Sequence, residues 1–242
     1  KVLKIFGIIL VLLIVAIGVT PFLFKDKIKE LVIKTINNNL DANVSFADVD
    51  ISLFKSFPKA TVVINDLAII NKAPFEGDTL FYANELDLKM TLTELMKGEG
   101  EAMEIEGFSA KNAIANIIFN KDGVGNFDIA LKEDKPDEPQ TESAPLALAI
   151  DGYEIENLKF TFENQASNMK MVLDSINHSG DGSFKNQVVD LNTKTTTKLL
   201  FVMDSVNYVN NAKLSLDAVL GIDLNNQKYS FKQNKALINQ LP

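Results

Sequence analysis

The sequence predicts a mostly β protein that one N-terminal helix attaches to a membrane. Three features indicate this fold class: residues 5–24 are an uncharged apolar run, residues 25–41 carry a helical apolar stripe, and apolar residues then alternate with polar ones. The 242 residues are 46% hydrophobic, which is enough for an anchor and a real core. We therefore expect a transmembrane helix and an amphipathic helix, followed by a long twisted antiparallel sheet.

The composition excludes several classes of function. The net charge is −8 and the pI is about 4.8, so a phosphate-binding surface and a nucleic-acid partner are not expected. The chain has no Cys and one His, which removes disulfides, thiolate chemistry and Cys/His zinc sites. The absence of Cys also fits an oxidising compartment outside the cytosol.

The anchor is predicted from residues 5–24, which contain no charged residue. A helix of this length rises about 30 Å at ~1.5 Å per residue, which matches the hydrocarbon core of a bilayer. A cleaved signal peptide is the alternative, but its apolar region is shorter and ends at a small-residue site, whereas this run continues through Phe24. The predicted anchor includes Ile5, Leu10, Leu13, Val19 and Phe24.

The orientation of this span does not follow from the flanking charges. Lys1 and Lys4 precede it and Lys25, Lys27 and Lys29 follow it, so positive charge is present on both sides. The long, acidic, Cys-free remainder favours a location outside the cytosol. We expect a single-pass inner-membrane protein with a cytoplasmic N-terminus and most of the chain in the periplasm.

An amphipathic helix is predicted over residues 25–41, because apolar residues recur there at helical spacing between charged ones. This helix could lie on the membrane surface or cap the end of a sheet, since both roles need the same stripe. The residues of the stripe are Ile28, Leu31, Val32, Ile36 and Leu40.

Two β segments are predicted, over residues 42–131 and 146–242, on either side of an acidic, Pro-rich linker at residues 132–145. Short helical insertions are expected near residues 93–97 and 201–207. The alternating apolar residues taken to line one face of the first segment are Val44, Phe46, Val62, Ile64, Leu86, Leu88, Ile117 and Phe119.

No catalytic constellation is predicted. The Gly-containing stretches 122–126 and 180–182 lack the strand–loop–helix context of a phosphate site and are interpreted as hairpin turns. His178 precedes the second stretch and is interpreted as a solvated loop residue, without a second ligand or nucleophile at useful spacing. We expect no enzyme activity, no metal and no cofactor.

The apolar face of the strands must be covered, and one amphipathic helix is too little to cover it. The sheet could close into a sandwich, so that the stripe becomes core. It could instead curl into an open trough in which acyl chains lie shielded from water. Periodicity alone favours the closed core.

The order of short motifs along the chain resembles the N-terminal part of the AsmA-like family. The resemblance covers residues 1–130 best and the remainder more loosely. No single motif is specific, and their order carries the resemblance. These motifs are Pro21-Phe22-Leu23, residues 49–58 (VDISLFKSFP), Asn65-Asp66-Leu67, residues 74–80 (PFEGDTL) and residues 120–129 (NKDG followed by NFDI).

This resemblance implies a place among the bridge-like lipid transfer proteins, with TamB and YhdP as relatives. It favours the open groove over the closed core. It further implies an inner-membrane anchor, a β-groove in the periplasm, transport of phospholipids between membranes, and support of outer-membrane integrity. The eight alternating residues named above would then line the groove, and lipids would slide because nothing reads their headgroups.

The chain departs from the family pattern in two respects. Phe127 stands where the family often has Trp, and 242 residues make too short a groove to cross a periplasm. Because the groove would be too short, we expect that the chain is a fragment or that it hands lipid to partners instead of bridging alone. The alternative function is a non-catalytic scaffold subunit of a larger envelope complex, such as a secretion or energy-transducing machine.

Overall fold

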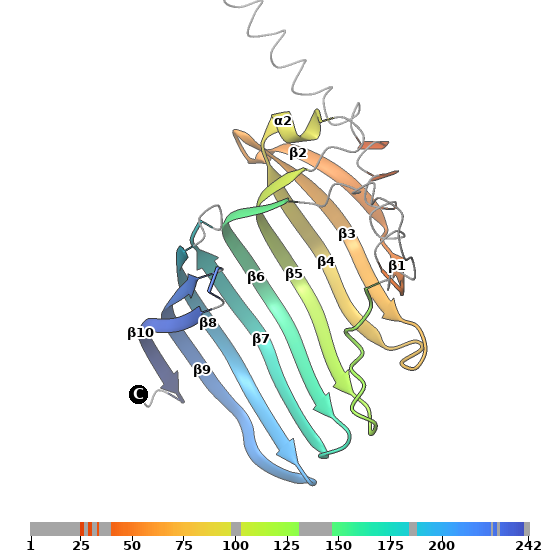
Figure 1. Cartoon of the computed structure of the whole chain (residues 1–242), viewed down its shortest axis with the longest axis vertical. Coiled ribbons are helices and arrows are strands. Elements are labelled where there is room, and N and C mark those ends of the chain that lie inside the picture. Colours follow the sequence, from red (N-terminus) through yellow and green to blue (C-terminus); the bar gives the residue numbers. More distant parts are fainter. Residues whose placement is uncertain are drawn as a thin grey trace, which may run out of the picture.

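The computed structural model describes residues 25–26, 29–30, 33, 40–97, 103–130, 147–183, 188–223, 225–226 and 228–239. Most of these residues lie in strands, which form one ten-stranded sheet (Figure 1). The prediction of a mostly β chain is confirmed. The elements are β1 (Ala42–Ser45), β2 (Asp48–Ser56), β3 (Lys59–Asn71), β4 (Thr79–Met90), α2 (Leu92–Leu95), β5 (Glu104–Phe119), β6 (Ala147–Asn164), β7 (Met169–Asp181), β8 (Val188–Met203), β9 (Val206–Asp223) and β10 (Lys228–Ile238).

The sheet is open, with β1 and β2 at one edge and β10 at the other, and it is not curled into the groove that was expected (Figure 1). From β3 to β10 the strands follow one another in chain order. β1 pairs with residues 68–71 of β3, and β2 pairs with residues 59–65, so these two short strands together make one interrupted edge strand. Both predicted β segments therefore contribute to a single sheet.

One strand pair corrects the prediction of an antiparallel sheet, because β5 and β6 run parallel. A parallel neighbour requires a long connection that returns the chain to the starting end of the first strand. Residues 120–146 provide it, with a turn at residues 120–123 and a bridge from Ala130 to Leu40 beside β1. In-and-out alternation reflects the pleat alone, so it does not distinguish a parallel neighbour from an antiparallel one.

The core lies where β2, the end of α2 and the start of β5 meet β3 and β4. Val49 and Val62 are at most 2% exposed, and Leu95 of α2 is 1% exposed. α2 begins at Thr91, whose side chain accepts a hydrogen bond from the Glu94 amide, as an N-cap residue should. This helix confirms the insertion expected near residues 93–97. The one expected near residues 201–207 is wrong, because those residues end β8, turn and begin β9.

A row of backbone irregularities crosses the sheet. Five residues in five different strands have positive φ, from 48° to 55°: Asp66, Asn112, Asn157, Ser175 and Asn211. The register aligns Asp66 of β3, Asn112 of β5 and Asn157 of β6 in one line across the sheet, which also crosses β4. Asn and Asp tolerate this left-handed conformation better than other side chains, and in a strand it marks a bulge.

The bulges keep the apolar side chains on one side of the sheet along the full length of the strands. In β3 the buried residues step by three across the bulge, from Ile64 to Leu67, and both belong to the same core cluster. β5 makes the same step between the buried Ala110 and Ala113. Without the extra residue, the second half of each strand would turn its apolar residues to the opposite face.

The predicted anchor and linker lie outside the described residues, as do Ile28, Leu31, Val32 and Ile36 of the predicted stripe. In the part of the chain that the structure describes, no helix is long and apolar enough to span a bilayer. The five described residues between 25 and 33 are helical, and Leu40 forms a β-bridge with Ala130.

Candidate functional site

One face of the sheet is apolar from β3 to β9, and we call it the apolar face. Its composition follows from the register: residues directly opposite each other on paired strands point to the same side. Its main residues are Val62, Ile64, Phe81, Leu86, Leu88, Phe108, Ile117, Ile155, Phe160, Phe162, Met171, Leu173, Leu199 and Phe201.

The best-aligned row of this face runs through the middle of the sheet. Phe81, Ala115, Phe160, Leu173 and Leu199 lie opposite one another on five consecutive strands. All five are half-buried, and Phe81 also packs against the core cluster, which ties this row to the core side of the sheet. The row therefore offers an apolar surface that crosses the strands.

Six of the eight predicted groove residues belong to the core cluster or pack against it. Val62 and Ile64 are 2% and 4% exposed, so other side chains already occupy their surroundings. Leu86 and Leu88 lie directly opposite them on β4 and are half-buried. The remaining two of the six, half-buried and packed against the cluster, are Val44 and Phe46.

Ile117 and Phe119 lie apart from the other six, at the far end of β5 on the same face. Ile117 is opposite Phe162, and the Phe119 ring lies 5.8 Å from the Phe162 ring and 5.4 Å from the Phe127 ring. These rings form an aromatic cluster at one end of the apolar face. Half-buried residues of this kind have surface to offer a ligand, whereas Val62 and Ile64 do not.

The motif that contains Phe127 has a structural role. Asn120 Oδ1 accepts hydrogen bonds from the amides of Asp122 and Val124, which closes the turn. Asn126 is 2% exposed; its side chain donates to the Asn116 carbonyl and accepts from the Ile118 amide. The motif thus pins the connection after β5 onto the sheet.

A polar cluster lies in the middle of the apolar face. His178 Nε2 is 2.7 Å from the Tyr153 hydroxyl and His178 Nδ1 is 2.8 Å from Thr195 Oγ1, while the Phe108 ring stacks on Tyr153 at 5.2 Å. Burial on this face lowers the pKa of His178 below its ordinary value and raises that of Tyr153. Both ring nitrogens are used inside the cluster.

The position of His178 corrects its interpretation as a loop residue. It lies within β7, which continues to Asp181. The small residue that suggested a turn, Gly180, is needed in the strand, because a Cβ there would come within 2.5 Å of the Tyr153 ring. In the sequence, the feature that could have indicated a strand here is a glycine that lies opposite an aromatic residue.

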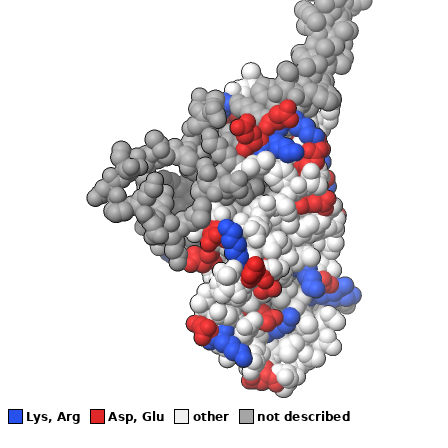
Figure 2. All heavy atoms as spheres, turned by 90° about the vertical axis from the view of Figure 1, so that its right-hand side faces the viewer, with Lys and Arg blue, Asp and Glu red and all other residues white. Residues whose placement is uncertain are grey.

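The opposite face of the sheet is polar, and its charges are largely paired. Lys55 Nζ lies 2.8 Å and 2.9 Å from the two carboxylate oxygens of Asp87 and 2.9 Å from Glu85, which also pairs with Lys111. The Asp87 side chain is only 5% exposed. At the β1–β3 edge of the sheet, which faces the viewer in Figure 2, basic and acidic side chains also lie next to each other rather than in one-signed areas.

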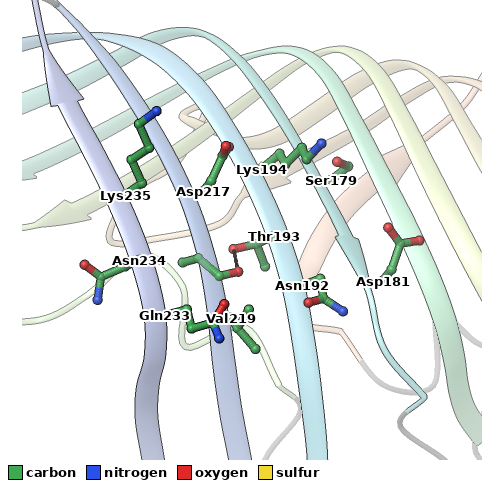
Figure 3. Close-up of a pocket in the computed structure, with 11 residues that line it drawn as sticks. Ser179, Asp181, Asn192, Thr193, Lys194, Asp217, Val219, Gln233, Asn234 and Lys235 are labelled. Carbon is green, nitrogen blue, oxygen red and sulfur yellow. Dashed lines mark hydrogen bonds between the residues drawn. The ribbon is translucent and has the colours of Figure 1, made fainter. Parts of the chain in front are cut away.

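A hollow of about 560 Å³ lies on this polar face between β7 and β10 (Figure 3). Asp181 and Asp217 line it together with Lys194 and Lys235, so both signs of charge are present. No group of His, Asp and Glu suited to a metal ion occurs among the described residues.

Comparison with known proteins gives one positive result. The family model of the AsmA family matches residues 1–237. None of the curated proteins compared with the chain matches it.

Proposed function

The chain belongs to the AsmA family, and we propose that it is a non-enzymatic protein that handles phospholipids on the apolar face of its sheet. The observation that carries this proposal is the row from Phe81 to Leu199, which is apolar, half-buried and continuous over five strands. In the described part of the chain, α2 packs against β3, and Phe127 of the connection after β5 packs at the far end of the face. A partly exposed apolar surface of this extent is typical of a binding site.

Acyl chains would bind this face by leaving water, at about 25 cal/mol per Å² of apolar surface. Hydrophobic burial is non-directional, so a chain shifted along the face keeps most of its binding energy. Lipids would therefore slide across the strands of the open sheet.

The proposed setting follows from the sequence. Residues 5–24 would anchor the chain in the inner membrane with the N-terminus in the cytoplasm, and the sheet would lie in the periplasm. Lipid would enter near residues 21–40, where the anchor meets the sheet. In this setting the protein would support lipid transport to the outer membrane.

The test is lipid uptake by the purified full chain. We expect phospholipids to co-purify, to appear in native mass spectra as several bound species, and to exchange with a labelled phospholipid. A preparation that is free of lipid and takes up no labelled phospholipid would contradict the proposal.

A scaffold role is the second candidate, and the β10 edge favours it. β10 pairs on one side with β9, and its Tyr229 and Phe231 are 72% and 67% exposed. A free strand edge can accept a strand from a partner through backbone hydrogen bonds. A stoichiometric protein that stays bound through mild-detergent purification and is lost on Phe231→Pro would favour this role.

A further inference from the structure

Four large apolar side chains project from one end of the sheet, and we call them the apolar tip. They are Phe54 and Phe57, in and after β2, and Leu92 and Met96, in and after α2. Their exposed fractions are 80%, 75%, 43% and 68%, respectively. Scattered single apolar residues on a surface are ordinary, but four around one edge need an explanation.

The register places all four at the same end. Ser56 pairs with Lys59 across the β2–β3 turn, and the next residue, Ala60, pairs with Met90 at the end of β4. α2 starts two residues after Met90. Figure 1 shows α2 beside the β2–β3 turn at this end of the sheet.

Buried neighbouring residues hold the backbone of the apolar tip in place. Leu53, next to Phe54, is 6% exposed, and Leu95, next to Met96, is 1% exposed; both belong to the core cluster. The buried neighbours fix the backbone, so the exposed side chains cannot turn inward without breaking the core. The sequence thus holds large apolar groups in water at fixed positions.

The contacts of Lys25 indicate what covers the apolar tip. Lys25 follows directly on residues 5–24, the predicted span, and its ammonium lies 2.7 Å from Asp48 and 2.8 Å from Asp50. Both carboxylates belong to β2, the strand that ends in the apolar tip. The residue after the span is therefore held at the start of β2, four residues or more before Phe54, which places this strand next to the bilayer.

We infer that the apolar tip inserts into the surface of the bilayer that holds the anchor. Phe, Leu and Met on one side of a structure are the groups that enter the boundary between headgroups and acyl chains, to a depth of about 5–10 Å. The nearby Lys55 and Lys59 are paired with Asp87 and Glu106, so insertion does not depend on acidic lipids. The inference rests on the proposed membrane setting and is independent of lipid binding on the apolar face.

The test uses tryptophan fluorescence, because the chain contains no Trp and any introduced one reports alone. Phe57→Trp and Met96→Trp are made in the full chain and reconstituted into phosphatidylcholine vesicles with or without brominated acyl chains. Ile114→Trp on β5 is the control, since Ile114 is 37% exposed and lies opposite Tyr82 and Lys159 on the polar face, away from the apolar tip.

At positions 57 and 96 we expect blue-shifted emission that brominated lipid reduces about twofold, as for a side chain within the acyl boundary. At position 114 we expect emission that brominated lipid leaves unchanged and iodide quenches. If position 57 behaves like position 114, or shifts to the blue without quenching by brominated lipid, the inference is wrong; the second result indicates a protein contact.

Lipid composition and lipid uptake provide two further tests. Quenching that appears only after phosphatidylglycerol is added would contradict insertion through apolar contact. If Phe57→Trp does not fold, Phe54→Trp replaces it, because Phe54 is equally exposed and also outside the core. Failure of lipid uptake with successful quenching would reject the proposed lipid handling alone, whereas the reverse result would reject the apolar tip alone.

Discussion

The sharpest prediction compares two neighbouring residues of β6 that point to opposite faces. Phe160 lies on the apolar face, between Ala115 and Leu173, whereas Thr161 lies on the polar face; both are half-buried. Phe160→Glu and Thr161→Glu therefore introduce the same charge one residue apart. We expect Phe160→Glu alone to weaken phospholipid binding.

The magnitude follows from the spacing of the strands. An acyl chain that crosses the sheet spends about 4.8 Å over each strand, a distance that holds about four methylenes. Displacing them from a hydrated carboxylate costs about 0.8 kcal/mol for each, or about 3 kcal/mol in total. Binding should therefore weaken about 200-fold.

The assay is titration of the purified full chain with a fluorescent phospholipid. Circular dichroism and thermal unfolding of both variants serve as folding controls. If Phe160→Glu and Thr161→Glu weaken binding equally, or if neither does, the apolar face is not the lipid site.

Three further predictions concern stability. Lys55→Met leaves Asp87 with a hydrogen bond from Ser109 and should lower the free energy of unfolding by about 2 kcal/mol; Asp87→Asn in the same chain should restore part, and a neutral single variant would contradict the pairing. Asn126→Ala removes three side-chain hydrogen bonds and should cost about 2 kcal/mol in denaturant unfolding; a loss below about 0.5 kcal/mol would contradict this role. Burial holds the pKa of His178 below its ordinary 6.5, so its contribution to stability should be complete above that pH and decline as the pH falls toward the folded-state pKa. His178→Gln should flatten this decline, and an unchanged profile would exclude His178 as its source.

Sequence periodicity predicted the strands well because each has one apolar side. Val62, Ile64, Leu86 and Leu88 were expected on one face, and the register pairs them across β3 and β4. The same pattern did not predict the row of bulges. Where the alternation shifts by one residue, as between Ile64 and Leu67, the sequence pattern indicates two separate strands. The register shows that both residues belong to one strand.

Other features depended on contacts between residues that are distant in sequence. The parallel pairing of β5 with β6 results from a long connection, and no local pattern specifies it. His178 was assigned to a turn because Gly180 and Gly182 follow it, whereas the nearby Tyr153 ring explains Gly180. The exposure of Phe54 and Phe57 likewise required the structure, because in the sequence they resemble the apolar residues of any strand.

The most direct test of lipid handling is site-specific photocrosslinking in the membrane. A benzophenone amino acid is placed at Phe162 on the apolar face or at Thr161 on the polar face, and the full chain is irradiated and analysed for lipid adducts. The account predicts phospholipid adducts at position 162 and none above background at position 161. Equal labelling at both positions, or the absence of phospholipid adducts at position 162, would contradict it.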